Sequence, residues 1–283
     1  MLACGLILAV FGLLVRVLNQ YIGNFTQVGM RMLLAGIIVI PVLLNKKISL
    51  KINCVNPFLF LALVLSFPLY IVFFTISINN TKIVNSFFYL FTSTMLTSYL
   101  LGSLFFKEKI NFQKIVVAIL SIIGLLLFML PFGSNKGFIG EIAGIIGGIL
   151  YGISHATRKY YANKIDRWVI IFYQMVSGVI ISFPFVFFLK EFAHNQWVFN
   201  SILLILIFAI GLVLIQVLLF TGFANFKLNL GSIVLASQLV FVQLIGVLIL
   251  HEIPTNLEVV GSILITVSVI FSNIEIKFPK KIY

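Results

Sequence analysis

The chain has 283 residues, of which 61% are hydrophobic and only 9% are charged, and its formal net charge is +12. A soluble domain carries roughly a quarter charged residues and cannot hide this much apolar surface from water. Composition therefore excludes a soluble globular protein and indicates that lipid surrounds most of the chain. The Lys and Arg residues stand in short clusters between apolar runs, which argues against nucleic acid as a partner.

A membrane-spanning helix needs about 20 mostly apolar residues. Turn-forming residues separate several apolar runs, for example NKKISLKINCVN at 45–56 and HEIPTN at 251–256. Continuous apolarity favours helices over barrel strands, whose polarity alternates with a period of two. The sequence therefore predicts an all-α integral membrane protein with ten transmembrane helices. They are expected at 2–19, 25–44, 57–79, 83–106, 112–131, 138–160, 168–190, 199–224, 230–250 and 256–273.

Basic residues are distributed unequally over the two sides of the membrane when the loops are assigned alternately. The side of the N-terminus collects fourteen, namely Lys46, Lys47, Lys51, Lys107, Lys109, Lys114, Arg158, Lys159, Lys164, Arg167, Lys227, Lys277, Lys280 and Lys281. The other side collects three, which are Lys82, Lys136 and Lys190. Because cytoplasmic loops carry an excess of Lys and Arg, both termini are predicted to be cytoplasmic.

The two halves of the chain show signs of an internal repeat. FFKEKINFQKIVV at 105–117 and LILHEIPTNLEVV at 248–260 each join two predicted helices, and their glutamates, Glu108 and Glu252, are 144 residues apart. Two halves of five helices enter the membrane in opposite orientations, because five is odd. The sequence therefore predicts two inverted five-helix repeats, at 1–134 and 135–283, as is common among secondary transporters. Both glutamates are expected to cap or brace their helix turns.

Five segments carry a family resemblance. They are FGLLVRVL at 11–18, RMLLAGIIVI at 31–40, LGSLFFKEKI at 101–110, GEIAGIIGGILYGISHATRKYY at 140–161 and GVLILHEIP at 246–254. By the order and spacing of these segments, the whole chain resembles the EamA-type ten-helix members of the drug/metabolite transporter superfamily. The resemblance implies a secondary transporter that moves a small-molecule substrate, often an amino acid, by alternating access.

Enzymatic chemistry finds little support in the residue types present. No Cys/His spacing is typical of a metal site, and no acid–base set stands close together, so we expect no catalytic residue, metal or cofactor. A membrane-embedded enzyme acting on lipid-linked substrates and a channel remain the alternatives. No carboxylate falls in the middle of a predicted helix, which favours facilitated exchange or weak coupling. Abundant Ile, Phe, Asn and Lys indicate an AT-rich genome, which we interpret as bacterial. The protein is therefore expected in the cytoplasmic (inner) membrane.

Two arginines and one histidine lie inside predicted helices. Charges within a membrane usually face protein or a water-filled cavity, so Arg16 and Arg31 either line the substrate path as partners of an anion or anchor their helices. His155 is a candidate for coupling protons, because a histidine can titrate near neutral pH. Its position near the cytoplasmic end of its predicted helix favours an interfacial hydrogen-bonding role instead.

The remaining candidates for the substrate path are polar or aromatic residues at depth, which need partners inside the bundle. They are Tyr70, Asn85, Tyr89, Ser93, Tyr151, Gln216 and Gln238. A second pattern is a run of glycines at every fourth residue of one predicted helix: Gly140, Gly144, Gly148 and Gly152. Small residues at this spacing allow close helix contact, either within the bundle or across a homodimer. Membrane lipid is the other expected partner.

Overall fold

The computed structural model describes residues 2–52, 56–108, 111–130, 135–193, 195–225, 228, 235 and 237–273. Within these residues the chain is helical and contains no strand. The α-helices are α1 (Leu2–Leu18), α2 (Asn24–Asn45), α3 (Pro57–Asn80), α4 (Ile83–Phe106), α5 (Phe112–Met129), α6 (Asn135–Tyr161), α7 (Arg167–Phe188), α8 (Phe199–Asn225), α10 (Ser237–Leu248) and α11 (Asn256–Asn273), and a 3₁₀ turn, η1, covers Glu191–Ala193. Most of the first part of the helix predicted at 230–250 lies outside the described residues.

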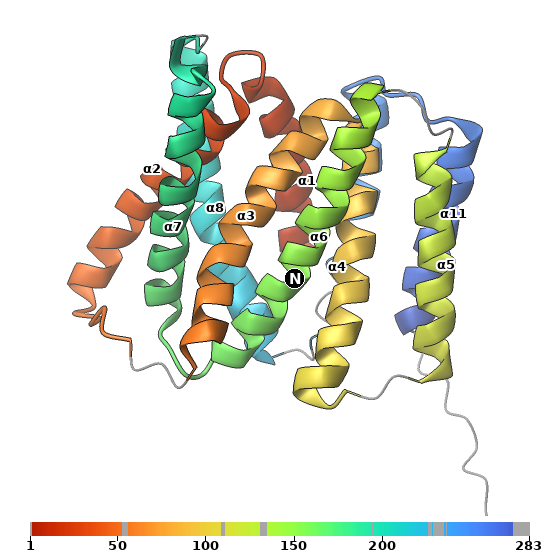
Figure 1. The fold of residues 1–283 in the computed structure, drawn as a ribbon, viewed down its shortest axis with the longest axis horizontal. Coiled ribbons are helices and arrows are strands. Elements are labelled where there is room, and N and C mark those ends of the chain that lie inside the picture. Colours follow the sequence, from red (N-terminus) through yellow and green to blue (C-terminus); the bar gives the residue numbers. More distant parts are fainter. Residues whose placement is uncertain are drawn as a thin grey trace, which may run out of the picture.

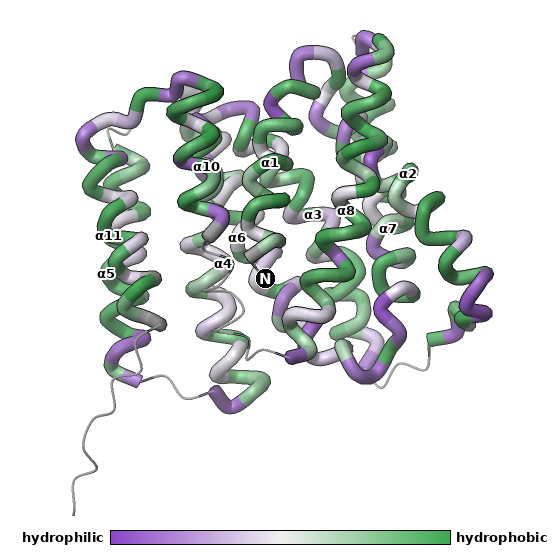
Figure 2. The backbone as a smooth tube through the Cα atoms, turned by 180° about the vertical axis from the view of Figure 1, so that it is seen from behind, coloured by the Kyte–Doolittle hydropathy of each residue, from purple (hydrophilic) through white to green (hydrophobic). Residues whose placement is uncertain are grey.

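The helices have the dimensions and surface of a membrane protein. Seven of the described helices, α2 to α8, are long and apolar enough to cross a membrane, and α1, α10 and α11 are shorter apolar helices. Large aliphatic side chains such as Ile37 and Ile180 are 52% and 66% exposed on the outside of the bundle. Figure 2 shows apolar helix shafts with hydrophilic residues gathered toward their ends. The predicted all-α membrane architecture is therefore confirmed for the described residues.

Helix starts are set by polar residues placed just before apolar runs. Asn56 accepts hydrogen bonds from the backbone N–H groups at the start of α3, and Pro57 occupies the first helical position. Asn111 and Asp166 cap α5 and α7 in the same way. Asn and Asp are preferred at these positions because they satisfy backbone donors that the helix itself leaves free.

The helices stand side by side as a bundle (Figure 1). α6 packs against both α3 and α4, α2 packs against α7, and α1 contacts α8 and α10. α5 and α11 form a separate pair at one edge of the bundle, linked to the rest mainly through α4. α2, α4 and α6 all run toward the lower side of the bundle in Figure 1, where the lysine-rich connections predicted to be cytoplasmic begin.

The glycine run of α6 explains how closely α4 approaches. A Cβ atom added at Gly144 would lie 2.8 Å from Tyr89 Cβ, and one added at Gly152 would lie 2.7 Å from Thr97 Cβ. The hydroxyl of Thr94 also donates to the backbone oxygen of Gly148 at 3.0 Å. The packing role within the bundle is confirmed, and α4 covers this face instead of a second copy of the chain.

Candidate substrate site

Arg31 lies in the interior of the bundle, on α2, with only 1% of its surface exposed. Its Nη2 donates a hydrogen bond of 2.7 Å to the hydroxyl of Thr75 on α3. The guanidinium carbon stands 4.4 Å from the centre of the Phe208 ring, within cation–π range. Nε and Nη1 have no hydrogen-bond partner among the described residues. The side chain is thus held in place while part of its donor capacity stays unused.

Arg158, near the end of α6, is the second buried arginine, with 0% exposure. Its Nη2 donates to Gln216 Oε1 on α8 at 2.6 Å, and its guanidinium carbon lies 4.8 Å from the Phe220 ring centre. Nε and Nη1 again lack a partner among the described residues.

Counting Arg158 with the basic residues of the cytoplasmic side is therefore wrong. The residue lies in the last turn of α6, inside the predicted helix, but its side chain points toward α8 and donates to the amide oxygen of Gln216. The other thirteen basic residues on that side still outnumber the three on the opposite side, so the orientation prediction does not depend on Arg158.

The side-chain amide of Gln216, which Arg158 contacts, is held in place by a second glutamine, Gln174. Gln216 Nε2 donates to Gln174 Oε1 at 2.7 Å, and Gln174 Nε2 donates to the backbone oxygen of Leu63 at 2.8 Å. Each amide is buried with 0% exposure. This chain of hydrogen bonds directs the oxygen of Gln216 at the arginine, and it links α3, α6, α7 and α8 at one depth in the bundle.

Aromatic rings fill the space around the two arginines. Tyr70 stacks on Tyr151 with ring centres 4.2 Å apart, and Tyr151 lies 4.0 Å from the ring of His155. Tyr70 lines the small cavity beside Arg31, and its ring also packs at 5.3 Å against Phe67, whose ring lies 5.5 Å from the guanidinium carbon of Arg158. These contacts bring residues of α3 and α6 that were predicted for the substrate path into one cluster.

The interfacial hydrogen-bonding role expected for His155 is wrong. The side chain is 0% exposed, packs between the rings of Tyr151 and Phe223, and neither ring nitrogen has a partner among the described residues. Like Arg158, His155 lies on the face of α6 that points into the bundle toward α8.

The central cluster is nearly closed in this conformation. Arg31, Tyr70 and Phe208 are among the residues that line a cavity of about 20 Å³, which is room for about one water molecule. A metabolite therefore needs a rearrangement of helices to enter.

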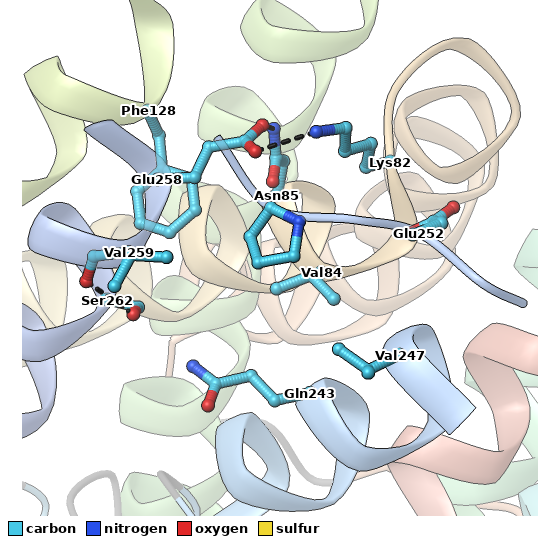
Figure 3. A pocket seen from close by; sticks show the side chains of 11 residues that line it. Lys82, Val84, Asn85, Phe128, Gln243, Val247, Glu252, Glu258, Val259 and Ser262 are labelled. Atoms are coloured by element: carbon cyan, nitrogen blue, oxygen red, sulfur yellow. Dashed lines mark hydrogen bonds and ion pairs between the residues drawn. The ribbon is translucent and has the colours of Figure 1, made fainter. Parts of the chain in front are cut away.

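A larger cavity, of about 220 Å³, lies between α4, α5, α10 and α11 (Figure 3). Its charged groups already bind one another. Lys82 Nζ lies 2.7 Å from Glu258 Oε2, and Asn85 Nδ2 donates to Glu258 Oε1 at 2.6 Å. We call this cavity the outer pocket. A ligand in it would have to displace these bonds, whereas Arg31 and Arg158 have N–H donors without partners among the described residues. The central cluster is for this reason the better candidate for a substrate site.

Glu252, which also lines the outer pocket, connects the turn before α11 with α1 and with the start of α4. Its Oε1 lies 3.2 Å from Arg16 Nη2, and its Oε2 accepts the backbone N–H of Ile83 at 2.9 Å. Burial raises the pKa of this carboxyl above its ordinary value, although the charge of Arg16 acts in the opposite direction. We call this set of contacts the Glu252 brace.

A similar set of contacts lies where α4 ends. Glu108 Oε1 lies 3.4 Å from Lys159 Nζ on α6 and accepts the backbone N–H of Leu228 at 3.0 Å. We call this set the Glu108 brace. The prediction that the two glutamates brace helix turns is confirmed, and the structure adds that each one ties its turn to distant parts of the chain.

Comparison with known proteins decides the family. The model of the EamA-like transporter family matches residues 1–130 and 138–274. The chain belongs to the EamA-like transporter family. It is accordingly a multi-pass membrane protein of a family that transports small solutes. A solved structure described only as "Crystal structure of protein" aligns with a TM-score of 0.73 and 11% identity over 96% of this chain and 95% of the other, which shows a shared fold. No curated protein matches the chain.

The other residues predicted for the substrate path lie elsewhere in this EamA-like chain. Arg16 belongs to the Glu252 brace, and Asn85 lines the outer pocket. Tyr89 and Ser93 lie against the glycine face of α6, where their Cβ atoms are neighbours of Gly144 and Gly148. Gln238 is buried on α10, a helix that packs against α1 and α4. The structure thus gathers Arg31, Tyr70, Tyr151, His155 and Gln216 and separates the remaining five.

The residues predicted for the substrate path did not include Arg158 and Gln174. Arg158 had one usable signal: it follows Tyr151 and His155 by seven and three residues, so all three share one face of a helix. Gln174 lies seven residues into α7, and Arg31 lies seven residues into α2. Gln174 and Arg31 therefore occupy equivalent positions in their helices, which can be recognised only when the first residues of α2 and α7 are known.

Proposed function

We propose that this EamA-like chain is a secondary transporter that moves a small metabolite, such as an amino acid, across a bacterial cytoplasmic membrane by alternating access. The observation that carries the proposal is the pair of matching braces. In each, a glutamate at a helix turn is ion-paired with a basic side chain and accepts a distant backbone N–H.

Residue spacing supports two inverted repeats, with halves at 1–134 and 135–283. Glu108 and Glu252 are 144 residues apart, and their basic partners Lys159 and Arg16 are 143 apart. The backbone donors Leu228 and Ile83 differ by 145. The family match to residues 1–130 and 138–274 also divides the chain near this boundary. Inverted repeats place equivalent contacts at opposite membrane faces, which is the symmetry that alternating access requires.

The braces suggest how the two faces open in turn. The Glu252 brace ties the turn before α11 to α1 and to the start of α4, and the Glu108 brace ties the end of α4 to α6 and Leu228. In the proposed cycle one brace opens while the other stays closed, so that the central cluster faces one side of the membrane at a time. The lysine-rich loops assign the Glu108 brace, and both termini, to the cytoplasm.

The test is efflux from proteoliposomes that contain the purified chain and a defined mixture of amino acids, carboxylic acids, nucleosides and sugars. We expect at least one compound to leave chemically unchanged, at a rate that saturates with its internal concentration. The rate should increase when the same compound is supplied outside, because a carrier then returns loaded.

Each alternative predicts a different result. A channel gives efflux that neither saturates nor responds to external compound, and an enzyme gives a new mass. Efflux no faster than from protein-free vesicles for every compound would contradict the transport proposal itself.

A further inference from the structure

Arg31 and Arg158 carry positive charge in the bundle interior, and neither is ion-paired with a carboxylate of the described part of the chain. The described residues form ion pairs between Arg16 and Glu252, Lys82 and Glu258, and Lys159 and Glu108, and none of these includes either buried arginine. A buried charge is costly unless it is paired, and removing its partner normally costs several kcal/mol. A charge that a protein keeps buried and unpaired is therefore suited to an anion that comes and goes.

The hydrogen bonds of the two arginines hold them in place without using them up. Arg31 is tied to Thr75 and Arg158 to Gln216, each through Nη2. In both side chains Nε and Nη1 remain without partners among the described residues. A guanidinium is always charged and presents its donors in a planar fork that fits a carboxylate. Each arginine is thus an oriented anion-binding group that is short of an acceptor.

The two arginines lie at different depths. Arg31 is seven residues after the start of α2, and Arg158 is three residues before the end of α6. At 1.5 Å per residue these positions are about 10 Å and about 5 Å from their helix ends. The start of α2 and the end of α6 point to opposite ends of the bundle in Figure 1. Tyr70 lines the same cavity as Arg31, and its ring centre lies 5.3 Å from that of Phe67, the ring that Arg158 faces at 5.5 Å.

The walls of the site indicate what accompanies the negative charge. Phe208 faces Arg31, and Phe67 and Phe220 face Arg158. Apart from the two arginines, the described polar groups here include no carboxylate. They are the side chains of Thr75, Ser154, His155, Gln174 and Gln216 and the hydroxyls of Tyr70 and Tyr151. A single carboxylate on a largely apolar body fits this lining, whereas a phosphate or a sugar would leave polar atoms against aromatic rings.

We propose that the transported substrate of this chain is a small carboxylate with an apolar body, and that Arg31 and Arg158 bind its carboxylate as successive stations on the path. This inference rests on the proposed transport function. The carboxylate passes from one guanidinium to the other, with Tyr70 and Tyr151 forming the wall between them. Neither station is saturated by protein groups, so each can accept and release the anion.

The test compares carboxylates with the corresponding amides, which lack the negative charge, in the proteoliposome assay. The internal mixture contains L-leucine with L-leucinamide, L-phenylalanine with L-phenylalaninamide, N-acetyl-leucine with its amide, and succinate with succinamide, next to nucleosides and sugars. Efflux from protein-free vesicles is subtracted. We expect a carboxylate to leave at least ~10-fold faster than its amide. Only the carboxylate carries a negative charge and two equivalent oxygens that can accept two parallel hydrogen bonds from a guanidinium.

Matched variants assign the effect to the two arginines. Arg31→Gln and Arg158→Gln should each reduce this efflux at least ~10-fold. Arg167→Gln removes a charge from an arginine whose Nη1 bonds the exposed Thr221 hydroxyl, and it should stay within ~2-fold of the parent. Selective efflux of neutral or cationic compounds would overturn the carboxylate inference while leaving the transporter intact. Unchanged carboxylate efflux in both glutamine variants would overturn the assignment of the stations.

A stability measurement separates binding from a structural role. Removing an unpaired buried charge should leave the thermal unfolding midpoint of the purified protein in detergent unchanged or higher in Arg31→Gln and Arg158→Gln. If both variants unfold at clearly lower temperature than Arg167→Gln, the guanidinium groups serve the packing of the bundle, and the inference is wrong even where efflux falls.

Discussion

Glu252 and Arg16 form an ion pair of 3.2 Å between residues that are 236 positions apart in the chain. The same carboxylate accepts the backbone N–H of Ile83, so it fastens the turn before α11 to α1 and α4 together. A partly buried carboxylate that makes both kinds of bond resists opening more strongly than an exposed ion pair would. The following predictions start from this contact.

Glu252→Ala should destabilise the protein more than Arg16→Ala. Loss of Arg16 removes one partly exposed ion pair and its bond to the Thr81 oxygen, a cost of about 1 kcal/mol. Loss of Glu252 also leaves the Ile83 N–H without its acceptor, for a total of about 2–3 kcal/mol. Thermal unfolding in detergent measures both. Equal losses would mean that the backbone bond contributes nothing.

Acid should open the outer end of the bundle. Burial raises the pKa of Glu252 above its ordinary value of 4.5, so the carboxylate becomes protonated, and the ion pair with Arg16 is lost, at a pH above that value. Val15→Cys, in a chain lacking Cys4 and Cys54, places a thiol beside Arg16 and in the lining of the central cavity.

Labelling of that thiol by an impermeant maleimide should increase as pH falls, after correction for the reagent's own pH dependence. In a Glu252→Gln background the labelling should be high at every pH, because the amide cannot form the ion pair. The same pH response in both backgrounds would show that another group controls the opening.

Gly148→Ala should disturb the α4–α6 contact, whereas Gly147→Ala should not. A Cβ atom at Gly148 would lie against the Leu90 backbone oxygen and 2.6 Å from Ser93 Cβ, but one at Gly147 would meet its nearest neighbours at 3.4 Å. We expect a loss of about 1–3 kcal/mol for the first and within about 0.5 kcal/mol for the second. Thermal unfolding in detergent of the two variants, which differ by a single position, measures the difference. Similar stability would contradict the close packing.

His155→Asn should change the rate of transport but not its dependence on pH. The imidazole is enclosed by the rings of Tyr151 and Phe223, and neither ring nitrogen has a partner among the described residues, so a proton bound there would place an unpaired charge in the interior. Transport assayed between pH 5.5 and 8 should keep the shape of the parent's profile. A profile that loses an inflection in the variant would restore the histidine as a proton-coupling group.

The sequence was most informative where a helix is defined locally. The helix predicted at 83–106 is α4 with the same bounds, and the one predicted at 57–79 is α3 to within one residue. Apolar runs of sufficient length, and caps such as Asn56, act over a few residues and can be read in one dimension. For the two braces, the sequence predicted the role of the glutamates but not their partners. Arg16 and Lys159 are distant in the chain and come close to Glu252 and Glu108 only in the folded structure.

The substrate site was less accessible because its contacts are tertiary. Arg158 reads as one more basic residue near a loop, and its partner Gln216 is 58 positions away. Tyr89 and Ser93, which are four residues apart and so share one helix face, were predicted for the substrate path, and the glycine run of α6 was also recognised. A single sequence does not show that these two helix faces contact each other. Because Tyr89 and Ser93 pack against Gly144 and Gly148, they are not part of the central cluster.

The most direct test of the account is to lock each brace and measure transport. In a chain without Cys4 and Cys54, one variant carries Arg16→Cys with Glu252→Cys, and the other carries Lys159→Cys with Glu108→Cys. A short reversible bis-methanethiosulfonate links each pair across its brace. We predict that either link abolishes efflux of the transported compound from proteoliposomes and that reduction restores it, since alternating access needs both ends to open. Undiminished efflux with either brace fully cross-linked would contradict the proposed mechanism.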